Sequence, residues 1–147
     1  TFIHHENSLP FQSINQGDSE LYALMKTTYE HDEGSWGRKF TCVIVKETNR
    51  RESIKTVTSV FLFKNETTKQ GEEPFKVSEE VKAVFQYEYT KAENAITYNP
   101  ESDKPLTDVL VYSDEVCDLF HARYANNNKG GLELWVKLRD DAKIPGH

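Results

Sequence analysis

The pair Glu133 and Trp135 places a carboxylate and an indole two residues apart in an alternating run of the sequence. In a β-strand, residues two apart project to the same face. A protonated amine inside a protein needs a carboxylate, because burying an unpaired charge is prohibitive. It also gains about 0.5 to 2 kcal/mol from each aromatic face that it contacts. Inside a barrel this pair suits a small organic cation, whereas outside a barrel it is an ordinary surface pair.

Acidic residues stand beside aromatic ones elsewhere in the chain as well. Tyr29 is followed by Asp32 and Trp36. Further candidates of this kind are Glu79, Tyr98 and Asp118. Charge-assisted hydrogen bonds from such carboxylates add roughly 1.5 to 3 kcal/mol each to the binding of a cation. The alternative for each of them is that it simply faces water, as most Asp and Glu side chains do.

The sequence lacks the patterns that are typical of enzymes. It has no Gly-rich phosphate loop, no nucleophile elbow and no zinc-protease spacing. His4 and His5 precede any clear strand, and residues 31–33 (His-Asp-Glu) are neighbours in a predicted turn, which seldom converge on one metal ion. His121 follows Phe120 in a predicted strand and is better placed as a surface or wall residue than as a general base. We expect no catalytic residue, no metal site and no cofactor.

Length and charge narrow the class of protein further. The 147 residues are most economically one domain, spanning residues 1–147. The net charge of −6 is spread through the chain, which argues against a nucleic-acid surface and favours cationic partners. No apolar run approaches the roughly 20 residues of a membrane-spanning helix. We therefore expect no nucleic-acid or membrane partner, and a monomer.

Period-two alternation and β-forming residues predict eight strands. They are expected at residues 21–29, 40–45, 54–63, 77–89, 95–98, 107–112, 116–124 and 132–138. In the first, Leu21, Ala23, Met25, Thr27 and Tyr29 share one side. The fourth contains helix formers at residues 79–83, but its second half alternates, so we assign it as a strand. Residues 10–14 are expected to form a short helical turn, with Phe11 and Ile14 on one face.

The strands succeed one another through short polar turns, without a long helix between them. Residues 126–131 (Asn-Asn-Asn-Lys-Gly-Gly) tolerate positive φ and predict a chain reversal there. This order indicates an antiparallel meander. Eight such strands can close into a barrel that holds one small ligand, and a flat sandwich is the structural alternative.

Cys42 and Cys117 both lie in strand-like contexts, and the residues alone leave open whether they are buried thiols or a disulfide. Asn65-Glu66-Thr67 forms an N-glycosylation sequon, which predicts a carbohydrate on Asn65 and is consistent with a secreted chain.

A series of short fragments resembles the tick salivary lipocalins, in particular the histamine-binding group. The fragments follow one another in the family's order and at nearly its spacing over roughly residues 11 to 145. They are Tyr29-x-x-Asp32, Trp36-Gly37, Phe40-Thr41-Cys42-Val43, Phe61-Leu62-Phe63, Glu93-Asn94-Ala95, Thr107-Asp108-Val109, Tyr112-Ser113-Asp114, Cys117-Asp118, Glu133-Leu134-Trp135 and Lys143-Ile144-Pro145.

The resemblance implies an all-β, eight-stranded antiparallel lipocalin barrel that is secreted in saliva and sequesters a host mediator. The residues that match the family's tighter amine site are Ser13, Tyr29, Asp32, Glu79 and Tyr98. The residues that match positions around a second site at the other end of the barrel are Trp36, Asp118, Glu133 and Trp135. Family members also continue past the Ile-Pro with further cysteines that pair with Cys42 and Cys117. Here the two thiols are either free in a shortened member or paired with a tail beyond this sequence, and we expect no bond between them.

The chain also departs from the family pattern. Ile96 and Leu106 replace two aromatic residues of the tighter site. An aromatic contact is worth about 0.5 to 1.5 kcal/mol beyond its area, so two losses weaken binding by roughly one to two decades. At the second site, an acidic position falls on Gly17, next to Asp18.

Fold does not determine function, and the resemblance supports two functions from different classes. The first, which we favour, is sequestration of histamine or serotonin inside the barrel. The second is binding of a host defence protein, such as a complement component, by the loops at residues 46–52, 65–73 and 126–131, with the barrel as scaffold. A lipid or eicosanoid carrier is a third possibility, which Ile96 and Leu106 would suit.

Overall fold

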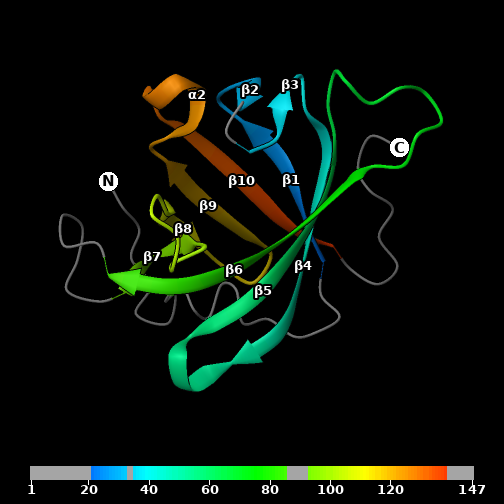
Figure 1. Cartoon of the computed structure of the whole chain (residues 1–147). Helices are drawn as coiled ribbons and strands as arrows, with labels where there is room; N and C mark the ends of the chain where they lie inside the picture. The colour runs from blue at the N-terminus through cyan, green and yellow to red at the C-terminus, as the bar shows by residue number, and fades with distance from the viewer. Residues whose placement is uncertain (1–20, 33–34, 86–92, 139–147) are drawn as a thin grey trace.

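Eight antiparallel strands form a closed barrel in the computed structural model, which describes residues 21–32, 35–85 and 93–138 (Figure 1). The strands are β1 (Leu21–Thr27), β4 (Thr41–Arg51), β5 (Thr56–Lys64), β6 (Phe75–Phe85), β7 (Glu93–Tyr98), β8 (Leu106–Ser113), β9 (Cys117–Ala122) and β10 (Gly131–Leu138). Each pairs with its neighbour along the chain, and β1 closes the barrel by pairing with both β10 and β4. The predicted all-β barrel is confirmed, and the sandwich is excluded.

Smaller elements gather at one end of the barrel. The strands β2 (His31–Asp32) and β3 (Gly37–Arg38) pair with each other, and in Figure 1 they lie at the same end as the helix α2 (Ala125–Asn128). A 3-10 turn, η1 (Glu52–Ile54), joins β4 to β5. Helix α2 occupies the predicted reversal, where Asn126, Asn127 and Asn128 have φ of 56°, 56° and 64°. The helical turn expected at residues 10–14 lies outside the described residues.

The first barrel strand differs from its prediction in length and in alternation. β1 ends at Thr27, before Tyr29, and a bulge between Leu24 and Lys26 shifts its pairing with β10. Tyr22 and Leu24 pack in the core, whereas Leu21 is 37% exposed. Because a bulge places one extra residue in a strand, the simple alternation of residues 21–29 does not persist through it.

The two cysteines lie on barrel strands, Cys42 exposed on β4 and Cys117 half-buried on β9. No disulfide joins them in the part of the chain that the structure describes.

The barrel interior combines apolar and acidic side chains. The buried members of its apolar cluster are Tyr22, Trp36, Val43, Val45, Val57, Phe61, Phe63, Val81, Ile96, Phe120 and Trp135. The buried carboxyl side chains are Asp32, Glu47, Asp108, Asp118 and Glu133. Among the described residues, no lysine, arginine or histidine is buried. Because Asp and Glu are seldom fully buried, this set of acids identifies the interior as the candidate functional site.

Candidate functional site

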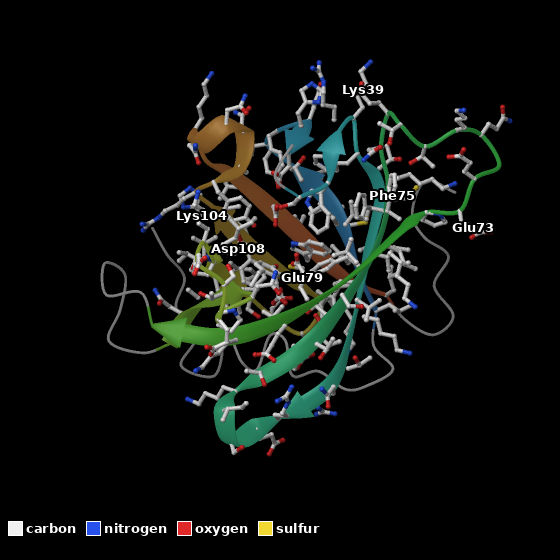
Figure 2. The ribbon with its side chains drawn as sticks, in the orientation of Figure 1. Lys39, Glu73, Phe75, Glu79, Lys104 and Asp108 are labelled. Atoms are coloured by element: carbon white, nitrogen blue, oxygen red, sulfur yellow. The ribbon has the colours of Figure 1, made fainter. Side chains whose placement is uncertain are left out.

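A cavity of about 220 Å³ lies at the barrel end that carries α2, β2 and β3. We call it the large cavity, and it is lined by Ser35, Trp36, Phe61, Phe63, Val77, Glu79, Tyr98, Leu106 and Tyr124. Its aromatic walls pack on one another, with the ring of Trp36 centred 5.1 Å from Phe61 and 5.4 Å from Phe63. Figure 2 shows Glu79 and Asp108 within the outline of the barrel, whereas Lys39 and Glu73 lie at its periphery.

A second and much smaller cavity, of about 30 Å³, lies further along the strands. We call it the small cavity, and it is lined by Tyr22, Val45, Glu47, Ser59, Phe61, Ile96, Tyr98, Asp118, Phe120 and Trp135. Phe61 and Tyr98 belong to the walls of both cavities, and their ring centroids are 6.0 Å apart. A space of this size holds roughly one water molecule.

Glu133 is the centre of a buried polar cluster between β1 and β10. It pairs with Thr27 across the ladder and is 2% exposed. The hydroxyl of Tyr29 donates to one of its oxygens, and Nε1 of Trp135 donates to the other at 3.3 Å. Burial raises the pKa of Glu133 to about 7, the two hydrogen bonds oppose that rise, and the charge of Asp32 adds to it. Glu133 is therefore costly to ionise unless a cation lies beside it.

Asp108 on β8 is the second deeply buried acid of this end, at 1% exposure. The hydroxyls of Tyr98 and Tyr124 face it, but neither of its oxygens has a hydrogen-bond partner of normal geometry among the described residues. Burial, followed by the charge of Glu133, raises its pKa well above the usual range. Tyr98 and Tyr124 also line the large cavity, so Asp108 lies directly behind that wall.

Glu79 is the carboxylate in the wall of the large cavity itself. It lies on β6, is half-buried, and its pKa is raised by burial while a hydrogen bond from Asn99 lowers it. Five aromatic residues surround the same space. A carboxylate facing several aromatic rings is the arrangement that holds an organic cation.

The structure brings some of the predicted site residues together and separates others. Trp36 lines the same cavity as Glu79, and Glu133 contacts Tyr29. Of the residues expected at the second site, those that line the small cavity are Asp118 and Trp135. Leu106 is in the wall of the large cavity and Ile96 in that of the small one, while Ser13 lies outside the described residues.

Asp118 is buried and hydrogen-bonded to a neighbouring side chain, and it does not line the large cavity. It is 4% exposed, and Oγ of Ser113 donates to its Oδ1 at 2.5 Å. Asn65, the predicted glycosylation site, lies outside both cavities, directly after β5.

Asp108, Tyr124 and Glu47 are among the residues of the site that were not sequence candidates. A usable signal existed for Asp108, because Leu106, Asp108 and Leu110 alternate along β8 and so share a face with apolar side chains. Tyr124 was predicted to end the strand at residues 116–124, but β9 ends at Ala122 and Tyr124 lies between β9 and α2.

No group of three or more potential metal ligands is gathered anywhere in the described residues. None of the helices described here has the length and apolar character that crossing a membrane requires.

Comparison with known proteins identifies similar chains. The family model described as "Tick histamine binding protein" matches residues 7–147. A female-specific histamine-binding protein 1 from Rhipicephalus appendiculatus is 39% identical over 117 residues, covering 80% of this chain and 59% of the relative. A male-specific histamine-binding salivary protein from the same tick is 34% identical over 140 residues, covering 92% of this chain and 66% of the relative. The matched part of this chain thus spans about three fifths to two thirds of these relatives.

Proposed function

Because the chain belongs to the tick histamine-binding protein family, a group of salivary lipocalins that bind ligands rather than catalyse reactions, we propose that it sequesters a small biogenic amine inside its barrel. Histamine and serotonin are the candidate ligands, and the protein would act after secretion in saliva. The observation that carries this proposal is the set of five buried carboxyl side chains, with no buried basic side chain among the described residues.

The large cavity is the place where the amine would bind. An ammonium group beside Glu79 supplies a positive charge that a half-buried carboxylate needs, and the rings of Trp36 and Tyr98 supply cation–π contacts. Of the two aliphatic replacements, only Leu106 lines this cavity, and five aromatic residues line it as well. The aromatic character that the sequence departures put in doubt is thus largely retained.

Asp108 and Glu133 would strengthen the attraction from behind the wall. Burial disfavours their charged forms, so each carries an electrostatic cost that a nearby cation offsets. The small cavity, at about 30 Å³, is too small for a second ring-bearing amine. We therefore propose one amine per chain, in the large cavity.

Calorimetric titration of the purified protein at neutral pH, first with histamine and then with serotonin, tests the proposal. We expect saturable one-to-one binding at micromolar or tighter concentration. Glu79→Gln should weaken binding by about tenfold or more, because it removes a charge-assisted contact. Glu80→Gln is the matched control: the neighbouring carboxylate lies in an exposed ion pair with Arg51, and its loss should leave affinity within about twofold. Folded protein that shows neither heat of binding nor thermal stabilisation with either amine would refute the amine proposal.

The other functions considered from the sequence receive less support. Neither the family description nor the names of the relatives point to a complement component or another host protein. A lipid or eicosanoid carrier would have to place an apolar chain against the carboxylate of Glu79 and near Asp108, which is unfavourable.

A further inference from the structure

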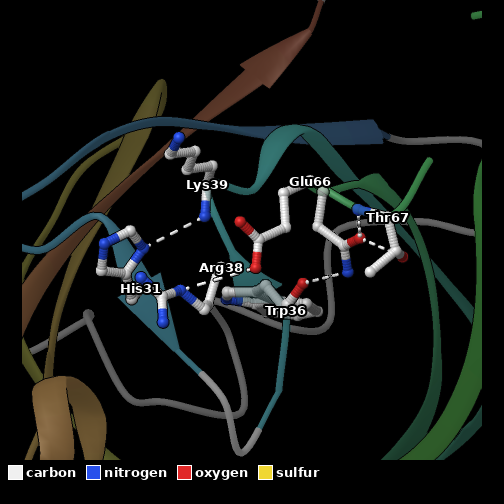
Figure 3. Close-up of polar contacts among 7 residues, drawn as sticks. His31, Trp36, Arg38, Lys39, Glu66 and Thr67 are labelled. Carbon is white, nitrogen blue, oxygen red and sulfur yellow. Dashed lines mark hydrogen bonds and ion pairs between the residues drawn. The ribbon is translucent and has the colours of Figure 1, made fainter. Parts of the chain in front are cut away.

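The segment after β5 contacts Trp36 and Arg38, the latter on β3, through three polar contacts, of which Figure 3 draws those made by side chains. Nδ2 of Asn65 donates to the carbonyl of Trp36 at 2.8 Å. The backbone N–H of Glu66 donates to the carbonyl of Arg38 at 3.0 Å, and the two side chains form an exposed ion pair at 3.5 Å. Of these contacts, the one made by the Asn65 side chain acts on the residue whose indole lines the large cavity.

The Asn65 side chain is itself held in one orientation. Its Oδ1 accepts hydrogen bonds from the backbone N–H of Thr67 at 2.9 Å and from the Thr67 hydroxyl at 2.6 Å. Its own backbone N–H donates to the hydroxyl of Thr68 at 3.1 Å. With the carbonyl oxygen engaged on one side, the amide nitrogen is directed toward the carbonyl of Trp36.

Gly37 permits this close approach. Its φ is +86°, and a Cβ built on it would come within 2.6 Å of Nδ2 of Asn65. Glycine is the residue that combines a positive φ with no side-chain volume. The backbone of residues 36 and 37 therefore packs directly on the Asn65 amide.

The held residue forms part of the proposed amine site. Trp36 is 8% exposed, and its ring contacts Phe61, Phe63 and Trp135 with centroids at 5.1, 5.4 and 6.4 Å. The carbonyl that Asn65 binds belongs to the same residue as the ring, so this hydrogen bond sets the position of the cavity wall. Asp32, which is 4% exposed, lies on the strand paired with β3 and shares that placement.

We propose that Asn65 is a positioning residue for ligand binding, which acts through the backbone of Trp36 and does not depend on a carbohydrate. The inference rests on the proposed amine function. Asn65 and Thr67 form a glycosylation sequon, whereas the geometry makes the Asn65 amide the donor to Trp36 and the Thr67 hydroxyl only one of two groups that hold the Asn65 oxygen.

Two substitutions separate these roles in protein made in bacteria, which carries no carbohydrate. Asn65→Asp keeps an acceptor for Thr67 but removes the donor to Trp36. Thr67→Ala destroys the sequon equally but leaves that donor in place. We expect Asn65→Asp to weaken histamine binding by about tenfold, the size of one hydrogen bond, and Thr67→Ala to remain within about threefold of wild type.

Acrylamide quenching of tryptophan fluorescence gives a second readout that needs no ligand. The chain has two tryptophans, Trp36 and Trp135. Asn65→Asp should increase quenching, and the increase should vanish when Trp36→Phe is added, because only Trp135 then emits. Circular dichroism confirms that each variant is folded.

Wild-type affinity and unchanged quenching in folded Asn65→Asp would overturn the inference. So would an equal loss in Thr67→Ala, which would assign the effect to the loop rather than to the amide donor. If wild type binds neither histamine nor serotonin, the proposed function fails and the ligand-binding role fails with it. The quenching comparison still decides separately whether Asn65 positions Trp36.

Discussion

Replacing Glu133 by glutamine should make the protein more stable at pH 8 and should remove part of its pH dependence. Glutamine has nearly the shape of glutamate: its Oε1 can accept from Nε1 of Trp135, and its NH2 group can donate to the hydroxyl oxygen of Tyr29, which reverses the direction of that bond. The substitution therefore removes a titratable charge from a site that is 2% exposed, while it changes the packing little.

The size of the effect follows from the pKa. Burial raises the pKa of Glu133 from 4.5 to about 7. Each unit corresponds to about 1.4 kcal/mol, so the ionised side chain costs the folded state about 3 kcal/mol above pH 7. Between pH 4.5 and 7 the folded protein holds a proton that the unfolded chain has lost. Wild-type stability therefore falls as the pH rises through this window, by about 1.4 kcal/mol per pH unit from this group.

Urea unfolding at pH 5, 6, 7 and 8 without any amine measures this difference. The free energy of unfolding of Glu133→Gln should exceed that of wild type by up to about 3 kcal/mol at pH 8, and the two should converge toward pH 4.5. The charge of Glu133 also raises the pKa of Asp108, so its removal eases the ionisation of Asp108 and adds to the difference in the same direction. Glu80→Gln, which alters an exposed ion pair, should show a flat difference.

A constant difference between Glu133→Gln and wild type from pH 5 to pH 8 would refute this reasoning. A variant less stable than wild type at pH 8 would refute it as well, because the two hydrogen bonds would then outweigh the cost of burial.

Three further changes test the packing around the site by denaturation. Gly131→Ala would place its Cβ 2.3 Å from the ring of Tyr29 and should lower the free energy of unfolding by about 1 to 3 kcal/mol. Gly71→Ala, which has open space around it, should lower it by only about 1 kcal/mol because of its positive φ. Equal losses in the two variants would contradict the close contact at Gly131. Tyr29→Phe removes the hydroxyl that donates to Glu133 and should lower stability at pH 8 by about 1 to 3 kcal/mol, so an unchanged midpoint would dismiss that hydrogen bond. Phe61→Ala joins the two cavities and should cost about 3 to 5 kcal/mol, and a loss below about 1 kcal/mol would remove Phe61 from their common wall.

The fold was predictable because its signals are local. Alternation and turn residues placed most barrel strands within a few residues, and the reversal at residues 126–131 needed only Asn and Gly. The strand predicted at residues 40–45 was too short, because the charged residues after it continue β4 to Arg51 by pairing with β5. The bulge in β1 was not predictable, because it depends on pairing with β10. The strand predicted to begin at residue 54 begins at Thr56, because the exposed Ile54 belongs to the turn η1 although it is itself a β-forming residue.

The sequence indicated which kinds of side chain line the barrel interior, but not which of them contact one another. The carboxylate and indole of Glu133 and Trp135 do face one way, and the Trp135 Nε1 bonds to that carboxylate. The meeting of Glu133 with Tyr29 depends on the register of β1 against β10, which no local pattern contains. Asp108 was not predicted as a site residue because a single acid in an apolar run is also typical of a strand residue that faces water. Only closure of the barrel buries it.

The closing of the barrel has a consequence for the order of assembly. The strand β1 pairs with β10, so Leu21 meets Leu138, and the hydroxyl of Tyr29 meets a carboxylate 104 positions later in the chain. Contacts between such distant positions slow folding, and all-β domains dominated by them typically fold in about milliseconds to seconds. During synthesis, β1 must wait for its partner until the ribosome has released β10. The proposed amine site is therefore complete only once this seam has closed, and a chain truncated before residue 131 would lack both the seam and the acid that it buries.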